Sequence, residues 1–364
     1  MTSLTPCYIT KTGSYLPGPR ISNDQIARYL GEIDGEQEVK QNVLRMNGIV
    51  GRHYAQDSSQ KATDDVYGLG AKAVCQVLDH HAGDVTYLSA GTTYAPMSGP
   101  GIGTMLHHHL REKGKLTHPI ELSSHGGICT SSAAALVGAI RAVQTGEHAS
   151  ALSVGTEHAS EVLKSSVIDP IDDRDQHPNI RRSQWFMSVF LRFMLSDGAG
   201  TFLLQNEPSQ SGLSLRVDWT HSMSYAHSTQ LCMKMETRKA RLSQDVQVLS
   251  RYLFESSRDF LASALSKHGE SLDHYHMILP HLSSFFFRRR MERIMQAHVT
   301  TLRSEVPYWT NLATAGNTGA ASIYVMLDQF LKDHEITEDQ RLLLFIPESG
   351  QFNFVLVSLT AVVQ

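Results

Sequence analysis

The chain has 364 residues, 41% of them hydrophobic, which is enough apolar material for one large domain or two similar halves. Its 32 basic and 36 acidic side chains give a formal charge of −4, so no general basic field exists to hold nucleic acid. The longest apolar runs, such as 342–346 and 352–356, are far shorter than the roughly 20 residues that cross a bilayer. We therefore expect neither a nucleic-acid partner nor a membrane span.

The N-terminal segment 1–12 reads as a β-strand and lacks the charged start and long apolar centre of a signal peptide. The four cysteines are widely spaced and form no C-x-x-C pair, which suits a reducing compartment. They are Cys7, Cys75, Cys129 and Cys232. We expect a cytoplasmic protein in which any special cysteine is special for its reactivity.

Segments 85–90 and 151–155 have the short apolar runs of buried strands, and segment 131–145 between them has the small and apolar residues of a buried helix. The order strand, helix, strand indicates mixed α/β architecture. Segment 107–109 is three histidines within a predicted helix, where adjacent side chains point to different faces. This pattern favours a solvated helix face and no metal site.

Segment 196–204 reads as a turn that opens into a strand, and segment 212–217 starts another strand after a polar stretch. We place a boundary between two halves, 1–210 and 211–364, in that stretch. The charged, proline-bearing segment 169–182 is predicted to be a mobile surface loop, either a plain solvated loop or a lid.

The second half repeats the scheme of the first. Segment 277–279 is a predicted strand that leads into Pro280 and His281. Segment 317–330 is a predicted helix that begins in a turn of small residues.

Cys129 follows two glycines and precedes a run of small residues suited to a tightly packed helix. A cysteine at a helix start lies in the positive end of the helix dipole, which lowers the thiol pKa and favours a nucleophilic thiolate. A buried structural cysteine is the alternative interpretation.

Two features of the second half favour the nucleophile. His281 ends an apolar strand, and Asn317 stands among very small residues at a predicted helix start. A cysteine nucleophile with a neutral histidine and an asparagine donor could attack a thioester and stabilise a carbonyl or enolate oxygen. Each signal alone also fits a satisfied polar side chain or a turn and cap.

The sequence resembles the ketoacyl-acyl-carrier-protein synthase III group of the thiolase superfamily. The markers that carry the resemblance follow one another in family order from residue 13 to residue 350. They are 13–17 with Asn23, 48–52, 91–93, 126–135 around Cys129, 196–200, 280–281, 316–322 and 349–350. The resemblance implies a thiolase fold, in which two pseudo-duplicated α/β halves form five layers, αβαβα, and pair into homodimers through strands of the first half.

The resemblance also implies roles for the marked residues. Cys129 would carry the acyl group, and its N–H with that of Gly350 would form a first oxyanion hole. His281 and Asn317 would bind the thioester carbonyl of a malonyl-type donor, whose loss of carbon dioxide leaves a carbanion that attacks the acyl-cysteine. Coenzyme A or the phosphopantetheine of an acyl carrier protein would bring the substrates, and no further cofactor is expected.

The sequence departs from the family at Ser284, where an asparagine usually helps to orient the loop after the histidine. The acceptor therefore stays open. The first possibility is a carbon–carbon condensing enzyme that uses a malonyl-type or β-ketoacyl thioester, in fatty-acid-type or specialised-metabolite biosynthesis. The second is an acyltransferase of the same fold that forms an ester, amide or thioester. The third, a non-catalytic partner subunit, is disfavoured by the intact Cys129, His281 and Asn317.

Arg288, Arg289 and Arg290 come directly after three phenylalanines, shortly beyond His281. Three adjacent arginines near a tunnel mouth would suit the acidic helix or phosphopantetheine phosphate of an acyl carrier. A solvated arginine face is the alternative interpretation. The phenylalanines are expected in the core and tunnel wall.

Overall fold

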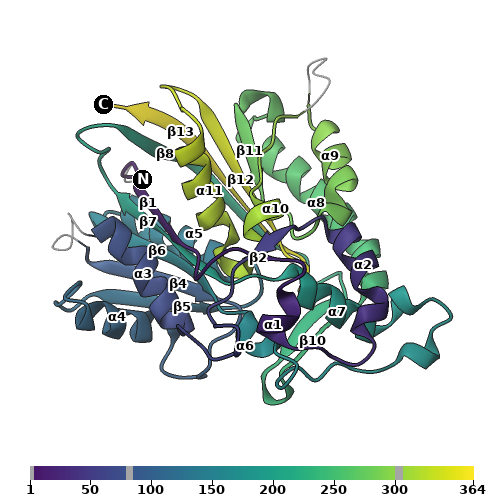
Figure 1. Cartoon of the computed structure of the whole chain (residues 1–364). Helices are drawn as coiled ribbons and strands as arrows, with labels where there is room; N and C mark the ends of the chain where they lie inside the picture. The colour runs from purple at the N-terminus through teal and green to yellow at the C-terminus, as the bar shows by residue number, and fades with distance from the viewer. Residues whose placement is uncertain (1–3, 79–84, 300–305) are drawn as a thin grey trace.

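A nine-stranded sheet runs through the molecule, in the computed structural model that describes residues 4–78, 85–299 and 306–364 (Figure 1). Its strands, in spatial order, are β11 (Met277–Pro280), β12 (Arg341–Pro347), β13 (Asn353–Val363), β8 (Leu213–Ser224), β1 (Tyr8–Tyr15), β7 (Gly198–Gln205), β6 (Ser150–Glu157), β4 (Tyr87–Thr92) and β5 (Glu121–Gly126). Two short two-stranded sheets lie outside it, β2 (Ile21–Ser22) with β3 (Gly51–Arg52) and β9 (Met233–Glu236) with β10 (Arg241–Gln244).

The sheet has two sections that meet only at the β1–β8 contact, where two residue pairs are in register, Tyr8 with Arg216 and Ile9 with Leu215. In the first section β4 runs parallel to β5 and β6, whereas β7 is antiparallel to β6 and β1. In the second section β11 and β12 are parallel and β13 is antiparallel to both of its neighbours.

Helices cover both faces of both sections (Figure 1). The helices are α1 (Ile26–Leu30), α2 (Glu36–Asn47), α3 (Val66–Leu78), α4 (Ile102–Glu112), α5 (Ser131–Gln144), α6 (Ser160–Leu163), α7 (Gln184–Met194), α8 (Val246–His268), α9 (Arg288–Gln296), α10 (Leu312–Ala315) and α11 (Ser322–Asp333). Short 3-10 turns are η1 (Arg174–Gln176), η2 (Ile180–Arg182), η3 (Thr237–Lys239), η4 (Leu272–His274), η5 (Phe285–Phe287) and η6 (Gly319–Ala321).

The buried apolar residues show the layers. One cluster joins α3 and α4 to β4, β6 and β7. A second joins α5 and α11 to strands of both sections, so these two helices form the middle layer. A third joins α1, α2, α7 and α8 to β11, β12 and β13. The predicted thiolase-type arrangement of five alternating layers, αβαβα, is thereby confirmed.

A row of glycines brings the middle helices close to the first section of the sheet. Gly91, Gly155 and Gly200 are register partners on β4, β6 and β7. A Cβ on Gly91 would lie 2.5 Å from Ser132 Cα at the start of α5, and one on Gly155 would lie 2.8 Å from the Ala320 carbonyl oxygen. Because a methyl group has no room there, the row fixes how deeply α5 and the turn before α11 sit in the fold.

Most predicted elements are confirmed with small shifts of their ends. Segment 1–12 yields β1 (Tyr8–Tyr15), although residues 1–3 lie outside the described part of the chain. Segments 85–90, 131–145 and 151–155 correspond to β4, α5 and β6. The histidines of segment 107–109 lie on α4 as predicted, and His108 is exposed.

The helix predicted over 317–330 is corrected: its regular part, α11, begins only at Ser322. Gly316 and Gly319 have φ of 73° and 52°, which breaks the helical path around Asn317. The amide oxygen of Asn317 accepts the Gly319 N–H at 3.0 Å and holds the turn in this shape. Asn317 therefore lies in a loop in front of the helix.

Segment 169–182 is largely exposed, as predicted, but several contacts tether it. Arg174 pairs with Asp34 at 2.8 Å, and its guanidinium lies 4.5 Å from the centre of the Trp185 ring. Buried Asp173 accepts the N–H groups of Gln184 and Trp185 at the start of α7. The segment thus anchors the helix that walls one side of the site described below.

The predicted division at residue 210 falls between β7 and β8, and the equivalence of the two halves stays a prediction. Within the described residues, none of the helices combines the length and the apolar character that a membrane crossing requires. Across the same residues, no group of three or more His, Cys, Asp or Glu side chains is arranged to hold a metal ion.

Candidate active site

Cys129 lies in the turn between the end of β5 and the first residue of α5, with Thr130 as the helix N-cap. The residue is partly exposed. Within the described part of the chain, no backbone carbonyl accepts a hydrogen bond from its N–H, which lies within hydrogen-bonding reach of the residue's own sulfur. The turn therefore presents a sulfur atom and an open donor at the same place.

The pKa of the Cys129 thiol is raised, first by burial and then by the nearby carboxylates of Glu348 and Glu157. This corrects the expectation that the helix dipole leaves a thiolate there: the burial and the two carboxylates outweigh the dipole. The resting group is a thiol, so attack on a thioester requires that its proton be removed.

His281 directly follows β11, where its backbone N–H donates to the Phe345 carbonyl oxygen at 2.8 Å. Its side chain is buried, and Nε2 has no hydrogen-bond partner in the described structure. Burial lowers the pKa of the imidazole to about 4, so the ring is neutral at physiological pH. A buried ring nitrogen without a partner is costly unless a ligand satisfies it.

Asn317 is buried, and both its backbone N–H and its backbone carbonyl are hydrogen-bonded. Its N–H donates to the Met194 carbonyl at 3.2 Å, and its carbonyl accepts the Ser196 N–H at 2.8 Å. Its side-chain oxygen faces the Gly319 N–H and the Ser322 hydroxyl at 3.0 and 3.4 Å. Among the described residues nothing accepts a hydrogen bond from Nδ2, which leaves this donor for a ligand.

Two apolar cavities meet at Cys129. The first, here named the α9 cavity, is lined by Cys129, His281, Phe254, Phe287, Met291 and Ile294. The second, the α7 cavity, is lined by Cys129, Asn317, Glu157, Phe190, Met194 and Leu242. The three predicted catalytic residues, which are far apart in sequence, are thus brought to the junction of two pockets of the kind that bind acyl chains.

Gly350 lies on the other side of the Cys129 turn. A Cβ on Gly350 would lie 2.9 Å from Ile128 Cγ1, so the absent side chain allows this close approach. Its carbonyl accepts the N–H groups of Cys232 and Met233, but no described residue accepts its own N–H. The N–H groups of Cys129 and Gly350 are therefore both open, as an oxyanion hole needs.

Two carboxyl groups close to the thiol were not identified from the sequence. Glu157 ends β6, and Glu348 follows β12. The signal that could have revealed Glu157 is its position at the carboxyl end of an otherwise uncharged, buried strand, where ligands of α/β folds often bind. Glu348 carried no such signal, because its approach to Cys129 depends on packing between the two sections of the sheet.

No protein-family model matches the sequence. Solved structures do match the fold. A variant of OleA from Xanthomonas campestris has a TM-score of 0.77 at 15% identity, over 99% of both chains. AbyA1, a tetronic acid condensing enzyme, has a TM-score of 0.76 at 18% identity, over 97% of this chain and 99% of that one. FabH, the 3-oxoacyl-(acyl carrier protein) synthase III of Pseudomonas aeruginosa PAO1, has a TM-score of 0.72 at 19% identity, over 98% of both chains.

The chain has the thiolase fold. Ser284, the position at which the sequence departs from the family pattern, is fully buried in this thiolase-fold chain. Its hydroxyl accepts the Phe286 N–H at 3.2 Å and its carbonyl accepts the Phe287 N–H at 3.1 Å, so it caps η5. Ser284 thus organises the turn after His281 through its hydroxyl and its backbone carbonyl, and its catalytic influence stays a prediction.

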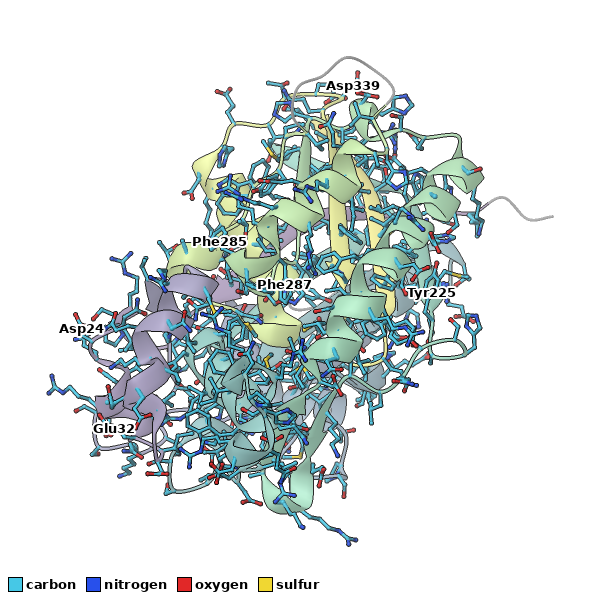
Figure 2. The ribbon with its side chains drawn as sticks, turned by 90° about the vertical axis from the view of Figure 1, so that its right-hand side faces the viewer. Asp24, Glu32, Tyr225, Phe285, Phe287 and Asp339 are labelled. Atoms are coloured by element: carbon cyan, nitrogen blue, oxygen red, sulfur yellow. The ribbon has the colours of Figure 1, made fainter. Side chains whose placement is uncertain are left out.

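The turn that Ser284 caps places its phenylalanines on two different neighbours. Figure 2 shows Phe285 beside the purple N-terminal helix α2 and Phe287 closer to the long helix α8. Phe285 packs on Gly48 at the end of α2, and the Phe287 ring centre lies 6.1 Å from that of Phe254 on α8. Phe287 lines the α9 cavity, in agreement with the expected tunnel wall.

The three arginines are exposed on the first turn of α9, but they point to different surroundings. Arg288 pairs with Glu292 at 2.8 Å. Arg288 and Arg289 line an open groove whose wall also includes Tyr308. The Arg290 guanidinium lies 4.8 Å from the ring centre of Phe254, which lines the α9 cavity. Of the three, Arg290 lies nearest to the lining of the site.

The raised thiol pKa predicts how Cys129 reacts with iodoacetamide. Because only the thiolate reacts, the alkylation rate at Cys129 should still be rising above the ordinary thiol pKa of about 8.5. Glu348→Gln removes one of the two negative charges and should move the curve to lower pH. Peptide mass spectrometry separates Cys129 from the other cysteines, and a midpoint at or below the ordinary value in the wild-type protein would contradict the electrostatics described here.

Proposed function

We propose that this protein is an acyl-thioester condensing enzyme that forms a carbon–carbon bond through an acyl-Cys129 intermediate. The observation that carries the proposal is the meeting of two apolar cavities at Cys129. Within the described residues, the wall of one cavity holds the unpartnered Nε2 of His281, and the wall of the other holds Asn317, whose hydrogen-bonded side-chain atom is the oxygen. The fold similarity to a tetronic acid condensing enzyme and to 3-oxoacyl-(acyl carrier protein) synthase III supports the same class of chemistry.

In the first half-reaction the sulfur of Cys129 attacks an acyl thioester of coenzyme A or an acyl carrier protein, and the bond from the acyl carbon to the carrier sulfur breaks. The thiol proton of Cys129 ends on the departing carrier sulfur, which leaves as a free thiol. The open N–H groups of Cys129 and Gly350 are suited to the negative charge that develops on the carbonyl oxygen. The apolar linings of the two cavities would hold the chain of the acyl group away from water.

In the second half-reaction a second thioester becomes a carbon nucleophile. Nε2 of neutral His281 and Nδ2 of Asn317 would donate hydrogen bonds to its carbonyl oxygen and stabilise the enolate. The low pKa of His281 is compatible with this role, because the neutral ring keeps one N–H that can donate a hydrogen bond. The same low pKa makes His281 a weak general base, which disfavours the alternative of acyl transfer to an oxygen or nitrogen nucleophile.

The proposed roles predict different losses in three variants. Cys129→Ala should abolish the acyl adduct detected by intact-mass measurement after incubation with acyl thioesters. His281→Ala and Asn317→Ala should keep the adduct but lower transfer from pre-acylated enzyme to a second thioester by about 100-fold, because they remove donors to the enolate oxygen.

Replacement of Cys7, Cys75 or Cys232 by serine provides the control and should leave the adduct in place. An adduct that persists in Cys129→Ala would refute the nucleophile. Pre-acylated enzyme that delivers its acyl group to an alcohol or amine and forms no carbon–carbon bond would establish the acyltransferase. A protein that takes up no acyl group would be the non-catalytic subunit.

Arg288, Arg289 and Arg290 are proposed to guide an acyl carrier. Reversal of charge at Arg290, which lies over the lining of the α9 cavity, should raise KM for carrier-bound substrate several-fold more than KM for a short free thioester, because only the carrier is large and acidic. Arg216→Glu, an exposed change on β8, serves as the control. Equal effects on both substrates, or no weakening of the difference by salt, would assign the arginines to packing instead.

A homodimer through the first half is also part of the proposal. Strand β5 pairs with β4 on one side only and ends the sheet, so its other edge is open to a second copy. Sedimentation at micromolar concentration should give about twice the chain mass of 40.4 kDa. A single-chain mass, or β5 amides that exchange at the same rate at high and low concentration, would contradict this pairing.

A further inference from the structure

Glu157 is a buried carboxyl group in the wall of the α7 cavity, which also contains Cys129 and Asn317. It is the last residue of β6, so its position is set by the sheet. Gly319 has no side chain where the Glu157 carboxyl packs against the Asn317 loop. The carboxyl group therefore lies against the Asn317 loop, in the wall of a cavity that Cys129 also lines.

The contacts of Glu157 leave it able to exchange a proton. Oε2 accepts the Ala320 N–H at 3.0 Å, and Thr93 also donates to the carboxyl group. Burial is the main reason that its pKa is raised to about 7. The titratable groups around it are Cys129 across the cavity, buried Asp197, which raises its pKa further, and His158, whose Nε2 lies 3.9 Å from Asp197.

Glu348, the other carboxyl group near the thiol, is hydrogen-bonded as Glu157 is, but it lies in a different pocket. The Thr130 hydroxyl donates to Glu348 Oε2 and the Asn353 amide to Oε1, whereas Glu157 accepts the Ala320 N–H and both the hydroxyl and the N–H of Thr93. Glu348 lines the open groove beside Gly350 and neither of the two cavities that contain His281 and Asn317. Glu348 is therefore a charge near Cys129, whereas Glu157 faces the space where substrate would react.

The charge of the cavities bears on the second substrate. Among the described residues that line the α9 and α7 cavities there is no lysine or arginine, and Glu157 is their single acidic residue. A malonyl-type donor brings a carboxylate, which would find no cationic partner there and would meet the Glu157 carboxyl. A thioester without that carboxylate avoids the cost, but it needs a base because no carbon dioxide leaves.

We propose that Glu157 is the base that removes the α-proton from a second thioester that has no α-carboxylate, such as a β-ketoacyl thioester. This inference rests on the proposed condensing function. The Glu157 carboxylate takes the proton, and the electron pair of the C–H bond forms the bond to the acyl carbon on Cys129. The C–S bond to Cys129 breaks, and its electrons stay on the sulfur.

The proton then passes from Glu157 to the Cys129 thiolate, which restores the thiol and the carboxylate. The pKa of the thiol is raised above its ordinary value while that of Glu157 is about 7, so the transfer is favourable in this direction. The reaction is balanced without an oxidant and without release of carbon dioxide. The two shifted groups thus act as one proton-transfer pair.

The test uses enzyme that is pre-acylated with octanoyl-CoA and then mixed with 3-oxooctanoyl-CoA or with malonyl-CoA. The wild-type enzyme should form carbon–carbon product from 3-oxooctanoyl-CoA, and Glu157→Gln should lower that rate by about 100-fold or more. Asp328→Asn, the loss of a buried carboxylate that lines neither cavity, should keep the rate within about threefold. The wild-type rate should fall as the pH drops through about 7, because the base becomes protonated.

The outcomes separate this inference from the function on which it rests. Product from malonyl-CoA alone, with release of carbon dioxide, would overturn the role of Glu157 but keep the condensing enzyme. No carbon–carbon product from either thioester would refute the condensing function itself. If Glu157→Gln does not fold, Glu157→Asp, which keeps a base at shorter reach, should retain partial activity; a wild-type rate that is constant between about pH 5.5 and pH 8 would then refute the inference.

Discussion

The absence of side chains along the row Gly91, Gly155 and Gly200 is the constraint on which the site depends. The three glycines are neighbours across β4, β6 and β7, and the middle helices press directly on them. At this short distance the Tyr324 hydroxyl donates to the Ser132 carbonyl at 2.8 Å, which ties α11 to the start of α5. Cys129 and Asn317 stand in the turns in front of these two helices, so their separation is set by backbone packing.

Such a rigid frame suits a reaction that is driven by preorganised donors. His281 and Asn317 are fixed by their backbone hydrogen bonds to β12 and to the end of α7, and within the described residues the buried Nε2 of His281 has no partner. A buried unpartnered donor costs stability until an oxygen of the substrate fills the position. Packing elsewhere in the frame offsets that loss of stability, and the unpartnered donor lies where negative charge would develop.

The protonation states of the groups at the site are controlled mainly by burial. Burial keeps His281 neutral and raises the pKa values of both Cys129 and Glu157. Cys129 and His281 are therefore uncharged at rest, and Glu157 can be either a carboxylate or a carboxylic acid near neutral pH. The arginines lie outside that space on the surface of α9, where they can act on a carrier without altering the chemistry.

The sequence alone predicted the fold class, through markers that occur in the order of a known family, and the three residues at the centre of the proposed mechanism. Each of the three stands in a local pattern: a small-residue helix start after Cys129, a strand end before His281 and a glycine-bounded turn around Asn317. Local patterns also located several elements, among them β1, β4, β6 and α5. They could not show that the thiol pKa is raised, since burial and the carboxylates of Glu157 and Glu348 come from segments distant in the chain.

Only the tertiary structure decided which charged groups share a cavity and which face solvent. Of the three arginines, Arg290 has its guanidinium over Phe254 in the lining of the α9 cavity. Asn317 precedes its helix, and Glu157 lies in the wall of the α7 cavity. The physical reason is that side-chain environment is created by packing between elements that are remote in sequence. A strand ending in glutamate has the same local pattern whether its carboxyl group meets water or a nucleophile.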